Sequence, residues 1–162
     1  MNSLRFMKDI ITGHRVLAGL LVSIVAAGML GAWWLVVRAE RDMREELLGR
    51  AQLAANAVNM ASVKTLTGSN ADLKSADYQQ LKKQFAAICA SQPDCRYVYL
   101  MGRRADGTMF FFVDSEPTDS TGYSPPGEVY EEATAEDIHV FNAKVASVVG
   151  PSSDRWGTWV SA

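Results

Sequence analysis

The residues of this chain that could do chemistry are few, and their spacing matches no catalytic motif. The two histidines, His14 and His139, lie far apart, and the sequence has no glycine-rich phosphate loop, serine-nucleophile elbow or zinc-protease motif. The acidic segment from Asp114 to Ser120 lacks the ligand order, the central glycine and the final glutamate of an EF-hand calcium loop. We therefore expect no catalytic residue, no metal ligand and no cofactor in this chain, and a weak site for a cation or a cationic ligand in the acidic segment stays open as the alternative.

A group of aromatic residues near strand-like segments is more typical of a binding site. Because alternate strand residues point to opposite faces, we expect four rings to share one face and Phe111 to lie on the other. These four rings are Tyr97, Tyr99, Phe110 and Phe112.

Pockets for small molecules are commonly lined by apolar and aromatic side chains with a few convergent polar groups. Two residues at expected strand ends would supply those polar groups, Asp114 and Arg155. For each residue, a position in the core or on the surface stays open as the alternative to ligand contact. The candidate ligand-binding residues are Tyr97, Tyr99, Phe110, Phe112, Asp114, Tyr130, Arg155 and Trp156.

The elements that hold these residues are predicted by local patterns. Segments 96–101 and 108–113 are rich in strand formers and flank an Asp-Gly turn signal, which predicts a β-hairpin. Ser75 is placed as the N-cap of a helix that buries one apolar face and ends before Pro93. We also expect a short helix over 130–142 and a third strand from Asp154 to Ala162. The buried face of the helix that follows Ser75 would carry Tyr78, Leu81, Phe85 and Ile88.

Cys89 and Cys95 flank the expected turn between that helix and the first strand. Their spacing matches neither a CxxC redox pair nor a four-ligand zinc site. A disulfide between them would constrain the turn covalently. In a reducing compartment, by contrast, the two cysteines would be expected as free thiols. Both alternatives stay open at this point, because spacing alone does not set the distance between the two Cα atoms.

The most distinctive feature is a run of 22 uncharged residues, Val16 to Val37. As a helix it is about 33 Å long, enough to cross a hydrocarbon core of about 30 Å. It is longer than the apolar region of a signal peptide and ends in Trp-Trp-Leu-Val-Val-Arg rather than at a small-residue cleavage site. We therefore expect a tail over 1–15, a transmembrane helix over 16–37, a stalk helix over 38–66 and a folded domain over 67–162.

The orientation of the transmembrane helix is not decided by charge. Three basic residues precede the run and four follow it closely, so the positive-inside count does not discriminate. The folded part must lie in the 125 residues after the run, and it holds both cysteines. We therefore expect a cytoplasmic tail and an extracytoplasmic domain on a single-pass chain in the bacterial inner membrane.

The net charge and the small residues of one helix face indicate which kinds of partner this chain binds. A net charge of −2 and a pI near 5.7 argue against nucleic-acid binding. One helix face presents small residues at four-residue spacing, which is compatible with close helix packing. We expect a small-molecule ligand, the membrane, and a second copy of the chain paired through the membrane and stalk helices. The small residues are Ser23, Ala27 and Gly31.

The chain resembles the Cache-type, periplasmic PAS-like sensor region of bacterial membrane receptors. The resemblance lies in the following stretches: Leu81 with Arg96-Tyr97-Val98-Tyr99-Leu100-Met101, the hairpin through Asp106-Gly107, Phe112-Val113-Asp114-Ser115-Glu116-Pro117, Pro126-Gly127-Glu128-Val129-Tyr130, and the segment 154–162. It implies an α+β fold with a long helix leaving the membrane and a central antiparallel sheet of about five strands with a ligand pocket on one face. The chain reaches only the third strand expected for that fold, so we expect a fragment of a longer receptor.

The function that the resemblance implies is the signal-sensing input region of a signal transducer, most often a histidine kinase. The same region could serve a diguanylate cyclase or a chemoreceptor. A hypothesis of another class is a membrane-anchored interaction protein that senses nothing and binds a partner by strand addition along its aromatic strand edge.

Overall fold

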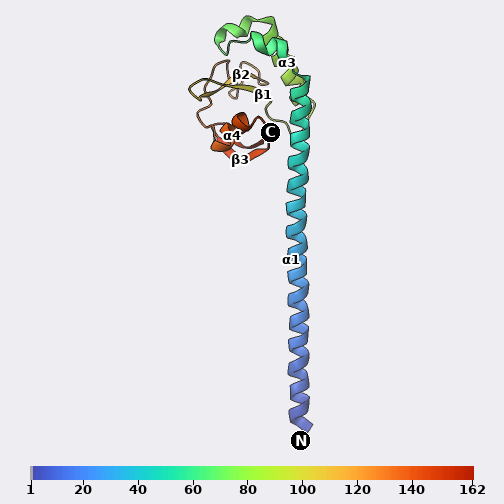
Figure 1. The fold of residues 1–162 in the computed structure, drawn as a ribbon. Helices are drawn as coiled ribbons and strands as arrows, with labels where there is room; N and C mark the ends of the chain where they lie inside the picture. Colours follow the sequence, from blue (N-terminus) through green and yellow to red (C-terminus); the bar gives the residue numbers. More distant parts are fainter. Residues whose placement is uncertain (1) are drawn as a thin grey trace. The chain divides into compact units, whose positions relative to one another are not determined.

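The computed structural model describes the backbone of residues 2–162 and the side chains of residues 17–162. The charges of the expected tail, Arg5, Lys8 and Arg15, and also His14, lie outside the described side chains. The chain forms two compact units, Met1–Glu46 and Leu47–Ala162, and each is described by itself. The elements, shown in Figure 1, are α1 (Asn2–Ala57), α2 (Met60–Thr65), the 3₁₀ helix η1 (Asn70–Lys74), α3 (Ala76–Ala90), β1 (Tyr99–Arg103), β2 (Met109–Asp114), α4 (Ala135–Ala143), β3 (Val149–Asp154) and β4 (Gly157–Ser161).

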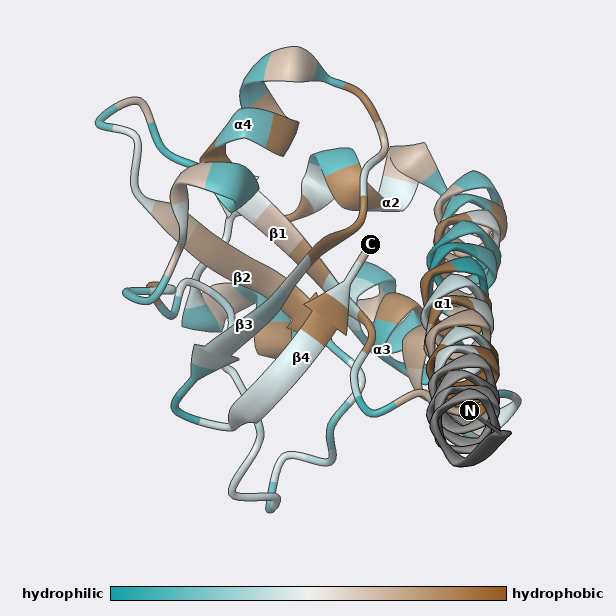
Figure 2. Cartoon of the chain, turned by 90° about the horizontal axis from the view of Figure 1, so that it is seen from below, coloured by the Kyte–Doolittle hydropathy of each residue, from teal (hydrophilic) through white to brown (hydrophobic). Residues whose placement is uncertain are grey.

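The architecture is α+β, with one long apolar helix and two small antiparallel sheets. The α+β class and the predicted hairpin of β1 and β2 are therefore confirmed. Figure 2 shows the two hairpins as separate pairs of arrows.

The long helix α1 contains the uncharged run. Within it, the described side chains of residues 17–37 are almost all exposed, including Trp33 at 66% and Leu30 at 66%. The helix is long and apolar enough to cross a membrane, a criterion that a signal sequence near an N-terminus also meets. Within the Met1–Glu46 unit the apolar side chains of this run are exposed, as they would be in a helix that spans a membrane.

The predicted stalk helix over 38–66 continues from the apolar run, but it ends earlier than expected. Helix α1 ends at Ala57, and the chain leaves the helical conformation at Val58 and Asn59 before α2 begins. Asn59 adopts φ −74° and ψ 102°, and its side-chain oxygen accepts the N–H of Ala61 at 3.0 Å. An asparagine that bonds the backbone ahead of it competes with helix continuation and caps the next helix instead.

Helix α3 supplies most of the core of the Leu47–Ala162 unit. Ser75 caps it by accepting the N–H of Tyr78 at 3.1 Å, as predicted. Its buried face packs against Val113 of β2, because residues three and four apart lie on one side of a helix. Tyr78, Leu81 and Phe85 are at most 3% exposed, which confirms their predicted place in the core.

The first hairpin carries a β-bulge that reverses the expected arrangement of rings. Leu100 pairs with Val113, but Met101 pairs with Phe111, so Phe112 is an extra residue in β2. An extra residue shifts the alternation by one and moves Phe111 to the face of Tyr99. The ring centroids of Tyr99 and Phe111 are 5.7 Å apart, whereas Phe110 and Phe112 pack against each other at 4.7 Å.

The prediction that four rings share one face and Phe111 lies on the other is therefore wrong. The first strand also begins three residues later than predicted, at Tyr99.

The C-terminal segment forms a second hairpin rather than one strand over 154–162. β3 and β4 pair antiparallel, with Arg155 and Trp156 in the turn. The Asp154 carboxylate accepts the N–H groups of Trp156 at 2.8 Å and Gly157 at 3.1 Å. This turn, in which an aspartate bonds the backbone just ahead of it, is what ends β3.

Helix α4 begins at Ala135, later than the predicted start at Tyr130. Thr134 and Asp137 form a capping box, in which the Thr134 hydroxyl accepts the Asp137 N–H and the Asp137 carboxylate accepts the Thr134 N–H. These reciprocal bonds satisfy exposed N–H groups of the first turn and set the start of the helix.

A buried carboxylate organises the loop before η1. Asp72 is 4% exposed and accepts the N–H groups of Thr67 at 2.9 Å and Gly68 at 2.8 Å. Burial by itself would raise the pKa of Asp72, but hydrogen bonds from Thr67, Gly68 and Ser69 outweigh it and hold the pKa below the usual value.

Replacing Asp72 with asparagine should lower the free energy of unfolding by about 1–3 kcal/mol at pH 7, because backbone donors lose a charged acceptor. The folded pKa is lowered, so the contribution of Asp72 is complete above the unfolded pKa of about 3.9 and is lost as pH falls through the folded value. The difference between wild type and Asp72→Asn should therefore shrink as the pH drops below about 4. Urea titrations of the full chain in detergent micelles measure both values. Asp119→Asn, at an exposed position, is the control, and a difference that stays constant with pH contradicts the interpretation.

Candidate ligand-binding site

The Leu47–Ala162 unit contains a cavity of about 370 Å³. One wall comes from the last turns of α1, with Leu47, Ala51 and Ala54, followed by Val58. Other parts of the wall come from β1 and from the second hairpin. The volume lies within the range usual for small-molecule sites, about 300–1,000 Å³.

Four aromatic rings form one wall of the cavity, and Phe111 stands at their centre. Its ring meets those of Tyr99, Tyr130 and Trp156 edge to face, at centroid distances of 5.7, 5.7 and 5.9 Å. Tyr130 stacks on Trp156 at 6.4 Å. Such ring pairs contribute about 0.5–1.5 kcal/mol each beyond burial, so the rings stabilise one another's positions in the wall.

The polar atoms beside these rings already have partners inside the protein. Asp154 accepts the indole N–H of Trp159 at 2.9 Å and the hydroxyl of Tyr130 at 3.3 Å. The hydroxyl of Tyr99 donates to the Ser161 hydroxyl at 3.2 Å. Burial, together with nearby carboxylates, raises the pKa of Tyr130, and burial raises that of Tyr99. Both phenols are therefore neutral at pH 7 and add no charge to the aromatic wall.

Asp114 lines the cavity, but its side chain is occupied with holding the following loop. Its carboxylate lies 2.9 Å from the Lys82 ammonium and accepts the N–H of Ser124 at 2.7 Å. The same ammonium donates to the Glu116 carbonyl and lies 4.4 Å from the centre of the Tyr123 ring. Burial raises the pKa of Asp114, and the bonds from Lys82 and Ser124 oppose this only in part.

Arg155 does not line the cavity. Its guanidinium forms two 2.8 Å bonds with the carboxylate of Glu132 and one of 3.0 Å with Glu128, and it covers the Trp156 ring at 4.7 Å. Hydrogen bonds and ion pairing with Glu132 raise the pKa of Arg155, so it stays charged. These ion pairs connect the second hairpin to the segment before α4, and the guanidinium packs against the Trp156 ring from outside the cavity.

The structure brings five of the eight candidate residues to the cavity and leaves three elsewhere. Phe110 and Phe112 lie on the other face of the first hairpin, close to Gly102. Arg155 lies outside, as described above. The five that line the cavity are Tyr97, Tyr99, Asp114, Tyr130 and Trp156.

Sequence reasoning missed three residues of the site, Phe111, Trp159 and Asp154. Phe111 depends on the bulge, for which the sequence carries no readable signal. The spacing of Asp154 and Gly157 around Arg155-Trp156 is the turn signal that could have revealed the second hairpin and, with it, the place of Trp159.

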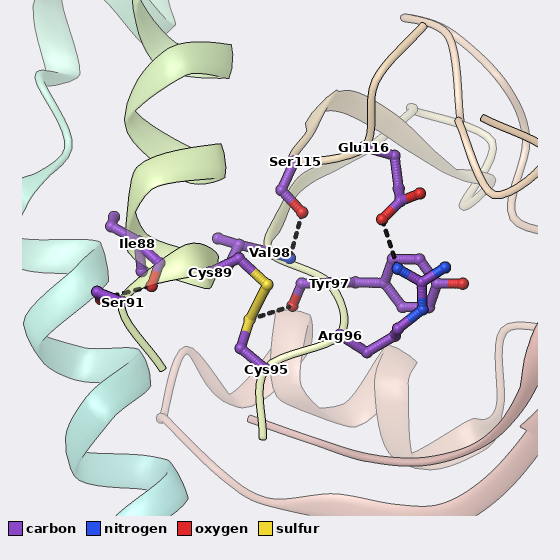
Figure 3. Close-up of a disulfide and its surroundings, with 9 residues drawn as sticks. All are labelled: Ile88, Cys89, Ser91, Cys95, Arg96, Tyr97, Val98, Ser115 and Glu116. Carbon is purple, nitrogen blue, oxygen red and sulfur yellow. Dashed lines mark hydrogen bonds and ion pairs between the residues drawn. A yellow bond between two sulfur atoms is a disulfide. The ribbon is translucent and has the colours of Figure 1, made fainter. Parts of the chain in front are cut away.

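A disulfide joins Cys89 and Cys95 next to the cavity, with Cα atoms 5.2 Å apart (Figure 3). It closes the turn between α3 and β1, and the Cys95 sulfur lies 3.7 Å from the Tyr97 carbonyl oxygen. Two further bonds hold the segment after it: Arg96 pairs with Glu116 at 2.7 Å, and the Val98 N–H donates to the Ser115 hydroxyl at 3.0 Å. The disulfide thus helps to position Tyr97 at the edge of the cavity.

Comparison with known protein families, curated proteins and solved structures finds no significant match to this chain. Among the side chains of residues 17–162, no group of three His, Cys, Asp or Glu residues is placed to hold a metal ion. The functional interpretation therefore depends on the cavity and on the elements around it.

Proposed function

We propose that this chain is the membrane-anchored sensory input region of a bacterial signal transducer, of the Cache type that its sequence resembles. The observation that carries the proposal is that helix α1 contains both the apolar run and one wall of an aromatic-lined cavity. A ligand in the cavity would touch the helix that enters the membrane. The output domain would be a histidine kinase, with a diguanylate cyclase or a chemoreceptor as the alternative.

The proposal places residues 16–37 across the inner membrane, the preceding tail in the cytoplasm and the α+β unit outside. The length of the apolar run supports the membrane span. The Cys89–Cys95 disulfide supports the orientation, because disulfides persist outside the reducing cytoplasm.

The proposed ligand is small, neutral and mainly apolar or aromatic. Rings of Phe111, Trp156 and Tyr130 would contact it, and the polar groups beside them are already paired within the protein. A charged ligand would lose hydration without finding a free partner among these groups. An apolar or aromatic ligand loses little favourable hydration on entering the cavity, and it gains van der Waals contact with the faces of these rings.

The proposed signal is a change in α1 that the ligand favours. A ligand can shift an equilibrium only as far as its affinities for the two states differ. Since Leu47, Ala51 and Ala54 of α1 line the cavity, a state with α1 packed closer to the ligand would bind it more tightly. Two chains, paired through the small-residue face of their membrane helices, would pass such a change across the membrane.

The experiment is a thermal-shift screen of the full chain in lipid nanodiscs against small aromatic and aliphatic compounds. A true ligand at about 100 times its Kd should raise stability by about 2.7 kcal/mol. Trp156→Ala should then weaken binding of that compound by about tenfold or more, because it removes one ring of the wall. Val145→Ala, which changes a 63% exposed residue outside the cavity, should leave binding unchanged. The proposal fails if no compound shifts the melting temperature, or if the compounds that do so bind Trp156→Ala equally well.

A further inference from the structure

The disulfide between Cys89 and Cys95 is not part of the buried core of the Leu47–Ala162 unit. That core consists of side chains of α3 and β2 and includes neither cysteine. The end of α3 has backbone bonds of its own, because the Ser91 N–H donates to the carbonyls of Ala87 and Ile88 at 3.1 and 3.2 Å. The closed loop is also short, with a sequence separation of six, and a short loop adds less stability than a long one. We therefore expect the unit to stay folded when this bond is broken.

The disulfide instead fixes the segment 95–98, which leads from the turn into β1. The structure describes these four residues outside any strand. Two side-chain contacts also hold the segment: the Val98 N–H donates to the Ser115 hydroxyl at 3.0 Å, and the Arg96 guanidinium pairs with Glu116 at 2.7 Å. The Arg96 side chain is 54% exposed, and ion pairs of exposed side chains contribute little stability. The covalent bond is therefore the strongest of these restraints.

The segment 95–98 also forms part of the cavity wall. The Tyr97 ring meets the Trp159 ring edge to face at 5.2 Å, and the Arg96 guanidinium covers the Tyr97 ring at 4.5 Å. Through these ring contacts, Tyr97 connects the segment to the second hairpin. A change in how firmly the segment is held would therefore change the position of Tyr97 in the wall.

The disulfide is accessible to a small reactant. Both cysteines are partly exposed to solvent, and most residues of the turn that they enclose are exposed. Figure 3 shows the bond between the end of α3 and the start of the segment 95–98. Thiol–disulfide exchange requires a thiolate to reach one of the two sulfurs. Exposed disulfides are accordingly the ones that are reduced most readily and that serve regulatory roles, whereas structural ones resist reduction.

We propose that the Cys89–Cys95 disulfide is a redox switch for the cavity wall, opened by small thiols of the glutathione class. In the oxidised form the bond holds the segment 95–98 at the end of α3 and keeps Tyr97 in the wall. In the reduced form the segment is held by the contacts of Arg96 and Val98, so it opens more often while the core stays packed.

The reduction consumes two thiol molecules and needs no other reactant. The thiolate of the first attacks one sulfur of the disulfide and forms a mixed disulfide, and the other cysteine leaves as a thiolate that takes up a proton. The second thiol cleaves the mixed disulfide and releases the remaining cysteine. The two cysteines thereby gain two electrons and two protons, and the two thiols leave as one oxidised disulfide. Because Cys95 follows Cys89 by six positions, the free thiols stay close, and an excess of the oxidised thiol re-forms the bond.

The test treats the full chain in lipid nanodiscs with millimolar reduced glutathione. Alkylation with N-ethylmaleimide, detected by mass spectrometry, should label both cysteines of the folded protein after this treatment and neither before it. Amide hydrogen exchange reports the segment, where the Cys95 N–H donates to the Gln92 carbonyl at 3.2 Å and the Val98 N–H to the Ser115 hydroxyl. Exchange at these two amides should become about tenfold or more faster on reduction, because the covalent restraint is lost.

The amides of Leu81 and Phe85 are the internal control, since these residues belong to the core of α3. Their exchange should not change on reduction. Replacing reduced by oxidised glutathione should restore slow exchange at Val98. Loss of protection at Leu81 and Phe85 would mean that the bond is needed for folding, and it would overturn the proposal.

A double variant, Cys89→Ser with Cys95→Ser, imitates the reduced form without any thiol. Its Val98 amide should exchange as fast as that of the reduced wild type, and glutathione should have no effect on it. Ala90→Ser changes an exposed residue beside Cys89, keeps both cysteines and should behave as the wild type in both conditions. If the double variant does not fold, the measurements on the wild type decide.

The proposal is also overturned if the disulfide resists reduced glutathione until urea unfolds the unit, or if reduction leaves exchange at Cys95 and Val98 unchanged. It does not depend on the proposed sensory function, because both readouts are taken without a ligand. A reducible bond with faster exchange, in a chain that no small compound stabilises, would support the switch alone. A compound that binds through Trp156, in a chain whose disulfide does not react with glutathione, would support sensing and overturn the switch.

Discussion

Replacing Asp114 with alanine should lower the free energy of unfolding of the Leu47–Ala162 unit by about 3–5 kcal/mol. The side chain of Asp114 is 5% exposed and that of its partner Lys82 is 13% exposed, so the substitution leaves an ammonium group in a poorly solvated site. The Ser124 N–H also loses its acceptor. Removing one partner of a buried ion pair destabilises the protein by more than the pair contributes in net stability, because the remaining charge is left uncompensated.

A double variant separates two contributions to this loss. One is the cost of the unpaired Lys82 ammonium, and the other is the lost hydrogen bond between Asp114 and the Ser124 N–H. Lys82→Met combined with Asp114→Leu replaces both charges by apolar groups and should recover more than half of the loss. Asp119→Ala, at an exposed position of the same loop, should change stability by less than about 0.5 kcal/mol. Urea unfolding of the full chain in micelles, followed by near-ultraviolet circular dichroism, measures all three. If Asp114→Ala lowers the free energy of unfolding by less than about 1 kcal/mol, the Lys82 ammonium is hydrated in the variant. That result would contradict the prediction, which depends on the burial of Lys82.

Phe85→Ala should destabilise the same unit by about 3–5 kcal/mol, since it removes a ring that is 3% exposed between Leu81 and Val113. The cost combines lost burial with the void left behind, and the void would open into the existing cavity because Phe85 also lines it. The same urea titrations give the value.

The control for Phe85→Ala is Val145→Ala, at a side chain that is 63% exposed, where the change should stay within about 0.5 kcal/mol. Equal effects of the two substitutions would show that the α3 face does not form the core. Xenon or a small apolar compound should bind the enlarged cavity of Phe85→Ala more tightly than that of the wild type.

The elements that could be predicted from the sequence are those whose signals act within a few residues. Ser75 caps α3 through a bond to Tyr78, three positions ahead. The Asp106-Gly107 turn closes the first hairpin, where Gly107 takes φ 94° and Asp106 accepts the Thr108 N–H. Each is a local contact that forms in nearly any surrounding fold.

Two differences between the predicted and the observed elements show where local sequence signals were insufficient. The helix that leaves the apolar run was expected to reach Leu66, but Asn59 breaks it, because a residue able to cap one helix also competes with another. The second hairpin was read as a single strand, since its turn residues Arg155 and Trp156 resemble strand residues and only the Asp154 side chain marks the corner.

The sequence by itself determined the long apolar helix, the α+β class, the first hairpin and the buried face of α3, because periodicity and capping act along neighbouring residues. Only the tertiary structure decided which rings meet. The bulge at Phe112 placed Phe111 beside Tyr99 and Trp156, and Arg155 turned away to Glu128 and Glu132. It also decided that residues of β1 and β4 line one cavity. Register and packing depend on contacts between segments far apart in the chain, whose energies no short stretch of sequence contains.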